Sequence, residues 1–339
     1  MIIIGLVTYA ATPYVKDSVS GSGNTRAILY VGGSGQGNYT DIQDAINDAS
    51  EGDIVFVFNG TYLGHILVNK PIDLIGEDKN TTIIDGYIAY TLSIVSDRVN
   101  MSGFTIQNDD RLGEGVRIDS CYNNFINNII YTPNDNIRIA GDKNIISDIT
   151  ITSDSIILSG NSNTLSDNVI INNDHGIYLV DSCENIISNN SFLNCGLFFS
   201  EYTVWNTIVM NNTINGKPLV YVDNESDLDL DVDAGQIILL NCTNITVQNK
   251  EIFNTTVGIQ LWGSNSCVIS DNSIVGNRYG IWINGWNNTI NDNTITNNNY
   301  SGILLHYDSD FNDIFNNIIT NNDEGMNIHP SINNTIFNN

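Results

Sequence analysis

Apolar and polar residues alternate along most of the chain in short stretches, which are separated by asparagine, aspartate and glycine. Each stretch is typical of a β-strand that buries one face. The stretches recur about every 22 residues, most clearly in a phrase of glycine, an apolar residue, any residue and an aliphatic residue. Copies of this phrase begin at Gly115, Gly176, Gly258, Gly280, Gly302 and Gly325.

A unit of this length cannot bury its apolar face alone, but stacked units share one continuous core. We therefore predict an all-β fold, a right-handed parallel β-helix solenoid with one coil of about 22 residues per repeat. Like residues of successive coils then lie about 4.8 Å apart. We expect the glycine that begins each phrase to occupy a bend with positive φ.

About one residue in six is asparagine, and a second repeated phrase ends in one. An inward column of asparagines can join successive coils through hydrogen bonds between side-chain amides. This predicted column consists of the residues that close the phrase: Asn128, Asp148, Asn168, Asn190, Asn212, Asn249, Asn272, Asn293, Asn317 and Asn339.

The N-terminal part of the chain departs from the repeat. Residues 1–25 combine a short apolar run with a polar linker, which is typical of a signal peptide or an anchor segment. Residues 26–70 are expected to form an N-terminal cap and the first coil. Within them, Thr40 to Ser50 predicts a helix with Thr40 as its N-cap and an apolar face that covers the open end of the solenoid.

The remaining residues, 71–339, are expected to form the β-helix itself. An insertion near 216–240 exceeds one repeat and predicts an extended loop or extra strands. The sequence stops within a repeat at Asn339. We therefore expect either that the natural chain continues or that its last coil stacks end to end on another surface protein of the cell envelope.

Two sets of phrases resemble known families. The opening resembles that of pectin-lyase-like β-helix proteins, and a later segment is similar to the NosD-type group of surface proteins built from β-helix repeats. The phrases are Asp41-Ile-Gln-Asp-Ala-Ile, Glu51-Gly-Asp-Ile-Val-Phe-Val, Asn59-Gly-Thr-Tyr and Ile72-Asp-Leu-Ile-Gly for the first, and Gly216-Lys-Pro-Leu-Val-Tyr, Asp233-Ala-Gly-Gln-Ile and Asn241-Cys-Thr-Asn-Ile-Thr-Val for the second. The resemblance implies the fold over residues 28 to 339, and activities that include lyases, hydrolases, epimerases, adhesins and copper-site maturation.

The charge balance narrows the choice of partner. The chain has 12 basic and 38 acidic residues, a net charge of −26. Such a surface repels nucleic acid, which is excluded as a partner, and it repels anionic membranes. Numerous Asn-x-Ser/Thr sequons and the signal-like segment favour an extracellular or cell-surface location, periplasmic in a bacterium.

An acidic column precedes several repeat starts and is a candidate catalytic site. Carboxylates in adjacent coils could lie about 5 Å apart, as in a retaining glycosidase. The alternative is a solvated turn in a chain that is rich in aspartate and asparagine. The candidate residues are Asp110, Asp135, Asp154, Asp174 and His175.

A second candidate site lies on the strand that follows each glycine, where alternate side chains should point outward. Exposed aromatic rings beside amide groups are suited to sugar binding. The alternative is that the rings pack beneath the insertion or stack on each other. The candidate carbohydrate-binding residues are Tyr178, Trp262, Trp282, Asn284 and His306.

Two metal hypotheses follow from other patterns. The run of alternating residues from Asp227 to Asp233 predicts a strand that buries Leu228, Leu230 and Val232. Its other face would carry four carboxylates, which could bind calcium or simply form a hydrated acidic edge. These carboxylates belong to Asp227, Asp229, Asp231 and Asp233. His306 and His329 occupy equivalent positions in adjacent coils and could both reach one copper ion.

Three functions remain open from the sequence. The first is an exported surface protein that binds a polysaccharide or surface glycan, or serves adhesion, without catalysis. The second is a carbohydrate-active enzyme, a hydrolase, lyase or epimerase that uses the acidic column. The third is a NosD-like periplasmic copper-handling factor. No phrase typical of the polygalacturonase-type hydrolases is present in the sequence, which favours the first function.

Overall fold

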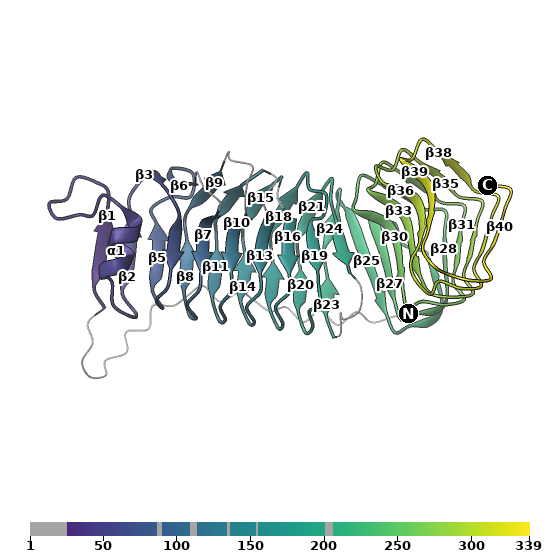
Figure 1. The fold of residues 1–339 in the computed structure, drawn as a ribbon, viewed down its shortest axis with the longest axis horizontal. Coiled ribbons are helices and arrows are strands. Elements are labelled where there is room, and N and C mark those ends of the chain that lie inside the picture. The colour runs from purple at the N-terminus through teal and green to yellow at the C-terminus, as the bar shows by residue number, and fades with distance from the viewer. Residues whose placement is uncertain (1–25, 87–89, 109–113, 134–135, 154, 201–205) are drawn as a thin grey trace.

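The computed structural model of the protein describes residues 26–86, 90–108, 114–133, 136–153, 155–200 and 206–339. The described residues form two stacks of β coils, a first stack from Ile28 to Ile214 and a second stack from Lys217 to Asn339 (Figure 1). The predicted right-handed parallel β-helix is confirmed. The signal-like segment of residues 1–25 lies outside the described residues.

Each full coil of the first stack passes through three parallel sheets in turn. Sheet 1 consists of β1 (Ile28–Val31), β2 (Ile54–Val57), β5 (Asp73–Gly76), β8 (Asn100–Ser102), β11 (Asn124–Ile126), β14 (Ile145–Ser147), β17 (Thr164–Ser166), β20 (Ile186–Ser188) and β23 (Ile208–Met210). Sheet 2 begins with β3 (Gly60–Leu63), β6 (Thr82–Gly86), β9 (Thr105–Asn108), β12 (Ile129–Tyr131), β15 (Thr150–Thr152), β18 (Val169–Ile171), β21 (Ser191–Leu193) and β24 (Thr213–Ile214). Sheet 3 consists of β4 (Ile66–Val68), β7 (Tyr90–Ile94), β10 (Glu114–Ile118), β13 (Asn136–Ile139), β16 (Ser155–Leu158), β19 (Ile177–Leu179) and β22 (Leu197–Phe199).

The second stack continues sheet 2 and adds two sheets of its own. Sheet 2 continues through β25 (Lys217–Asp223), β27 (Gln236–Leu240), β30 (Val257–Trp262), β33 (Tyr279–Asn284), β36 (Ser301–Leu305) and β39 (Glu324–Ile328). Sheet 4 consists of β26 (Ser226–Leu230), β28 (Thr243–Gln248), β31 (Val268–Ser270), β34 (Thr289–Asn291), β37 (Asp313–Phe315) and β40 (Thr335–Phe337). Sheet 5 consists of β29 (Glu251–Phe253), β32 (Ser273–Val275), β35 (Thr294–Thr296) and β38 (Ile318–Thr320).

The core consists of inward columns in which each apolar residue stacks on the equivalent residue of the next coil. In sheet 1, Leu74 pairs with Met101, Met101 with Phe125, and Phe125 with Ile146. All four side chains are almost completely buried. Burial of such a side chain contributes roughly 1.5–3 kcal/mol to stability, so the repeated alternation drives coil stacking.

A helix covers the N-terminal end of the first stack, as predicted. Helix α1 (Ile42–Asp48) buries Ile42, Ala45 and Ile46 against the first coils. Its N-cap is Asp41 rather than the predicted Thr40, because the Asp41 carboxylate accepts hydrogen bonds from the backbone N–H groups of residues 43 and 44. No helix of the described residues is both long and apolar enough to cross a membrane.

The predicted asparagine column joins successive coils. The Asn190 side chain donates from Nδ2 to Asn212 Oδ1 at 2.9 Å and to the Leu165 carbonyl oxygen at 2.9 Å. Its Oδ1 accepts from the backbone N–H of Asn168 at 3.0 Å. The same pattern continues in the second stack through Asn272, Asn293, Asn317 and Asn339. The column therefore satisfies buried backbone groups at the bend between two sheets.

The predicted asparagine column is wrong at two positions. Asp148 and Asn249 are exposed and have positive φ, and the residue that follows each of them occupies the column. There the backbone N–H of Ile149 donates to Asn168, and that of Lys250 donates to Asn272. The repeating unit is thus a pair of residues, of which the first adopts the left-handed conformation and the second points inward.

The glycines that begin each repeat do not have positive φ, so that prediction is also wrong. In the second stack, Gly258, Gly280, Gly302 and Gly325 stack directly on one another instead. A Cβ atom at Gly280 would lie 2.4 Å from the carbonyl oxygen of Gly302, and one at Gly302 would lie 2.6 Å from that of Gly325. At Gly280 and Gly302 the backbones of adjacent coils therefore approach too closely for a side chain, whereas Ser155 and Gln236 fill the equivalent positions of other coils.

The chain reverses direction between the two stacks. Asn215 and Gly216 have φ values of 51° and 80°, as in a type I′ turn. β24 and β25 consequently pair antiparallel, with Ile214 opposite Lys217. Residues 216–240 then form β25, β26 and β27, which begin the second stack.

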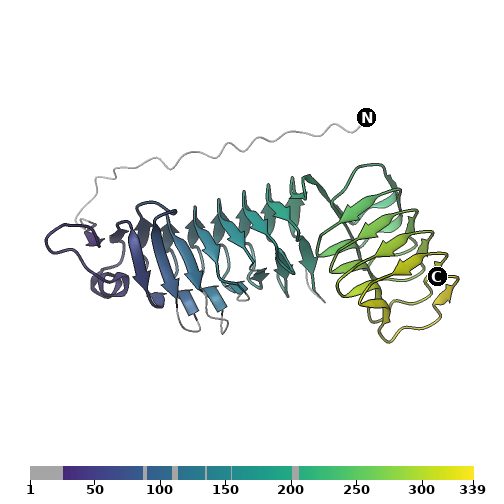
Figure 2. The same cartoon turned by 90° about the horizontal axis from the view of Figure 1, so that it is seen from above.

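The core changes face at this reversal. Ile214, Leu219 and Ile238 belong to the first core, whereas Ile237 and Leu239 belong to the second core on the opposite face of sheet 2. Reversal of strand direction alone would invert the hand of the coil. Because the core also moves to the other face, the second stack keeps the right-handed turn. Figures 1 and 2 show that it turns away from the axis of the first stack. We call this junction the elbow.

Candidate functional site at the elbow

At the elbow, sheet 2 of the second stack packs across the open edge of sheet 3. The last strand of sheet 3, β22, has no further strand beside it among the described residues. The Gln236 amide takes the place of that strand, because its Oε1 accepts from Leu197 N–H at 3.0 Å and its Nε2 donates to the Leu197 carbonyl at 2.7 Å. Gln260 Nε2 donates to the Phe199 carbonyl at 3.0 Å. These contacts fix the two stacks against each other.

A line of aromatic rings crosses the elbow. Phe198 lies between the stacks, with its ring centroid 5.0 Å from those of both His175 and Trp282. His175 stacks on Tyr178 at 5.1 Å. On the second stack the line continues from Trp282 to His306 at 5.6 Å.

The structure therefore brings together the residues predicted to bind carbohydrate, but it does not expose all of them. Trp282 is 8% exposed and His306 is 3% exposed, so the expected open aromatic face is wrong at its centre. The end of the first stack covers it, through Phe198. Tyr178 and Trp262 remain half-buried at its borders. Asn284 is also half-buried, and its amide bonds the neighbouring coils.

A pocket of about 320 Å³ lies beside the aromatic line, between the two stacks. An ion pair crosses it, with Arg278 Nη1 2.7 Å from Asp174 Oδ2. The other side chains that line it are mainly amides and hydroxyl groups. The lining residues are Asn173, Asp174, Asn194, Asn254, Thr255, Gly276, Arg278 and Asn299.

Buried polar atoms without a protein partner gather at this pocket. Both Oδ1 and Nδ2 of Asn173 are buried without a hydrogen-bond partner, and so is Arg278 Nε. Nδ1 of His175, the residue after Asp174, is also buried without a hydrogen-bond partner. Burial, together with the nearby Arg278 guanidinium, lowers the pKa of His175 to about 4, so the ring is neutral at pH 7. Buried polar groups normally have partners, so these four atoms mark the pocket as a candidate binding site.

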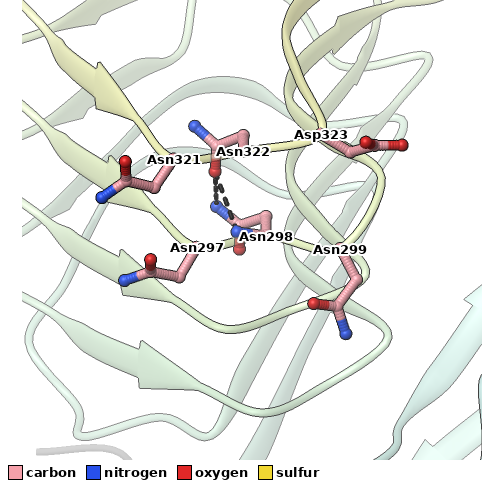
Figure 3. A pocket seen from close by; sticks show the side chains of 6 residues that line it. All are labelled: Asn297, Asn298, Asn299, Asn321, Asn322 and Asp323. Atoms are coloured by element: carbon pink, nitrogen blue, oxygen red, sulfur yellow. Dashed lines mark hydrogen bonds between the residues drawn. The ribbon is translucent and has the colours of Figure 1, made fainter.

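A second, shallower hollow of about 600 Å³ adjoins the first through Asn299 (Figure 3). Asn298 donates from Nδ2 to Asn322 Oδ1 at 2.7 Å and belongs to an internal amide column. Asn297 and Asn321 lie on one side of this pair, and Asn299 and Asp323 on the other. Tyr300, which follows Asn299 in sequence, is 40% exposed, and its ring centroid lies 5.0 Å from that of Tyr279.

The acidic column is represented at the elbow by one member. Asp110, Asp135 and Asp154 lie outside the described residues. The side chain of Asp174 is 83% exposed, and its described charged partner is Arg278. Catalysis by this column stays a prediction.

The acidic segment does not form the predicted alternating strand. Asp227 has a φ of 56°, which breaks the alternation, and Leu228 and Val232 are 38% and 49% exposed. Asp233 pairs with Lys217 at 3.1 Å, and this hydrogen-bonded ammonium lowers the pKa of the Asp233 carboxyl. Asp229 and Asp231 are exposed.

Neither metal hypothesis gains a ligand cluster. The rings of His306 and His329 lie 5.5 Å apart, as expected of adjacent coils. Within the described ranges, no group of three or more His, Cys, Asp or Glu residues is arranged to hold a metal ion. Calcium and copper binding stay predictions.

Sequence reasoning missed Asn173, Phe198, Tyr279 and Arg278. Asp174 and Arg278 are 104 residues apart, and only the reversal at the elbow brings them together. The reversal could have been predicted from the sequence. Asn215-Gly216 lies between two alternating stretches, and an Asn-Gly pair in that place is typical of a tight hairpin.

Comparison with known proteins agrees with this architecture. Residues 92–234 match the family model described as right handed beta helix region. The match agrees with the right-handed parallel β-helix fold that the coils of the structure show. Residues 226–339 match the family model described as periplasmic copper-binding protein (NosD), which confirms the NosD-type resemblance over the second stack. No protein of curated function matches the chain in sequence.

Several solved structures are similar to the chain over much of its length. The A-module of the mannuronan C-5 epimerase AlgE4 from Azotobacter vinelandii is 18% identical, with 91% of this chain and 100% of that chain covered and a TM-score of 0.39. Pectin methylesterase PemA from Erwinia chrysanthemi is 13% identical, with coverage of 71% and 82% and a TM-score of 0.37. An alginate lyase from a Paenibacillus species is 12% identical, with coverage of 92% and 98% and a TM-score of 0.34. At these identities and TM-scores, nothing said of these proteins is transferred to this chain.

Proposed function

We propose that the protein is an exported surface protein that binds a saccharide at the elbow pocket without catalysing its cleavage. The observation that carries the proposal is the Asn173 amide, whose two polar atoms are buried and have no partner in the protein. Amide groups beside aromatic rings can bond sugar hydroxyls and contact the sugar ring. The pocket volume of about 320 Å³ lies in the range of small-ligand sites.

Export to the periplasm or cell surface is part of the proposal. It is supported by the signal-like segment, by the sequons and by the periplasmic location in the name of the family matched over residues 226–339. A saccharide of the cell envelope or of the surroundings would then be accessible to the elbow.

The test is a glycan array followed by calorimetry on the purified chain, with and without calcium. We expect saturable binding that Asn173→Ala weakens at least fivefold. The matched control is Asn124→Ala, which removes a half-buried amide from sheet 1, far from the elbow, and should leave binding unchanged. The proposal would be contradicted if Asn173→Ala bound as tightly as Asn124→Ala. It would also be contradicted if the parent chain bound no glycan.

The same samples address the other two functions. Depolymerised or epimerised products that disappear in Asp174→Asn would overturn the non-catalytic proposal in favour of an enzyme. Stoichiometric copper that is lost in His329→Ala, with no saccharide bound, would overturn it in favour of the copper-handling function named for the matched family.

A further inference from the structure

We infer that the elbow pocket binds a neutral saccharide through two adjacent hydroxyl groups and rejects uronates. This inference deepens the proposed function and rests on it. It concerns the chemical class of the ligand, and it comes from the charges that line the pocket and from the geometry of one amide.

The pocket has no net positive charge with which to hold a carboxylate. Its charged lining residues are Asp174 and Arg278, and these two neutralise each other across the pocket at 2.7 Å. His175 lies against them and is neutral at pH 7. The adjoining hollow adds only the negative Asp323, and the whole chain has a net charge of −26. An anionic sugar would therefore enter an electrostatically unfavourable site.

The Asn173 amide offers one acceptor oxygen and one donor nitrogen side by side. Neither atom has a partner in the protein and both are closed to solvent, so a ligand bonds them when the Asn173 side chain rotates toward the pocket that it lines. Two hydroxyls on neighbouring ring carbons match this pair, because one hydroxyl can donate to Oδ1 while the other accepts from Nδ2. A uronate carries the same ring hydroxyls, so the amide selects for the hydroxyl pair, and the rejection of the C6 carboxylate comes from the charges that line the pocket.

The surroundings of the amide suit the rest of a sugar ring. The Arg278 guanidinium, which lines the pocket and pairs with Asp174 through Nη1, has further N–H groups that can donate to a third ligand oxygen. Asn299 lies at the border of the two hollows, and the exposed ring of Tyr300 follows it in sequence. An aromatic face can contact the C–H groups of a neighbouring sugar unit, so a short oligosaccharide fits better than a single unit.

The experiment compares matched hexasaccharides in the gluco, manno and galacto series. The two members of each pair share their linkage and differ only in a hydroxymethyl or a carboxylate group at C6. We expect at least one neutral member to bind tenfold or more tightly than its uronate partner at 0.15 M NaCl. Asn173→Ala should weaken that binding at least fivefold, and Arg278→Gln should weaken it while keeping the neutral preference.

Asn299→Ala is a second test of the pocket, in case the Asn173 substitution weakens binding by disturbing the fold. Asn299 is exposed on the opposite border and its side chain makes no hydrogen bond in the described structure, so this variant should fold normally and bind at least threefold more weakly. Preference for a uronate that depends on Asn173 would overturn this inference and leave the proposed function intact. A neutral preference that survives both alanine variants would overturn the assignment to this pocket. Binding of no member would overturn both proposals.

Discussion

At the scale of single residues, the abundance of asparagine has two distinct causes. Asn189 is exposed with a φ of 57°, a conformation that asparagine tolerates better than most residues. Asn190, its neighbour, is 1% exposed and bonds both adjacent coils. One residue type thus serves a bend in the backbone and a buried hydrogen-bond column at consecutive positions.

We predict that Asn190→Ala destabilises the first stack by about 3 kcal/mol, because it leaves several buried donors and acceptors unsatisfied. Urea denaturation followed by circular dichroism measures this loss. The control is Asn189→Gly, which keeps the positive φ and should change stability by less than about 0.5 kcal/mol. Equal losses in the two variants would contradict the division of roles.

His175 makes a pH-dependent contribution to stability. Its pKa is about 4 in the folded protein and 6.5 in the unfolded chain, so between these values the unfolded chain binds a proton that the folded chain does not. The free energy of unfolding therefore decreases as pH falls from 6.5 to 4, by about 3 kcal/mol from this group.

His175→Phe keeps the ring contacts with Tyr178 and Phe198 and removes the titration. We expect the variant to be more stable than the parent chain at pH 4.5, with the difference shrinking towards pH 7. Denaturation midpoints measured every half pH unit give this difference directly. If the stability of the variant and that of the parent chain changed equally with pH, the folded protein would not be keeping the His175 imidazole neutral.

At the scale of elements, the elbow depends on side chains that stand in for a strand. β22 would otherwise present unpaired backbone groups in a buried place, and Gln236, which is 0% exposed, bonds both the N–H and the carbonyl of Leu197. Strand edges in solenoids are usually covered by a further coil or by a capping element. Here the outer face of the second stack provides the cover.

We predict that Gln236→Leu preserves the coils but loosens β22, because leucine cannot bond the Leu197 backbone. Hydrogen exchange followed by mass spectrometry should show at least tenfold faster exchange in the peptide that contains Leu197. Gln248→Leu on β28, where the side chain is exposed, is the matched control and should leave that peptide unchanged. Unaltered protection of β22 in the Gln236 variant would mean that packing alone holds the elbow.

The sequence predicts local periodicity far better than it predicts the elbow. Strands such as β34, the capping helix and the asparagine column follow from alternation and spacing, which act within one or two coils. The burial of Trp282 does not, since it depends on Phe198, which is 84 residues away in sequence and reaches it only through the reversal at Gly216. The column assignments at Asp148 and Asn249 failed because a shift of one residue changes a side chain from outward to inward.

At the scale of the whole molecule, repulsion among the negative charges of the chain destabilises the compact folded state. A net charge of −26 lies on a structure whose described ion pairs are few and mostly on the surface. Exposed pairs contribute little, so the buried cores must outweigh the mutual repulsion of the carboxylates.

We predict that the melting temperature rises by several degrees when sodium chloride is raised from about 0.02 M to 0.3 M, because salt screens this repulsion over a shorter Debye length. Thermal unfolding by circular dichroism at pH 7 measures the change. Potassium chloride at equal ionic strength should act alike, since screening is not specific to one cation. A melting temperature that falls with salt would mean that attractive ion pairs dominate.

The turn at Asn215 and Gly216 has a consequence for how such a protein can change in length. The first stack contacts the elbow through its last coils, and the second stack through the coils that contain β27, β30 and β33. Beyond these coils each coil is hydrogen-bonded to its neighbours, so duplication or loss of one repeat there lengthens or shortens one arm by about 4.8 Å and leaves the junction unaltered. In evolution, and equally in design, the reach of the two arms can vary independently while the corner between them keeps its shape.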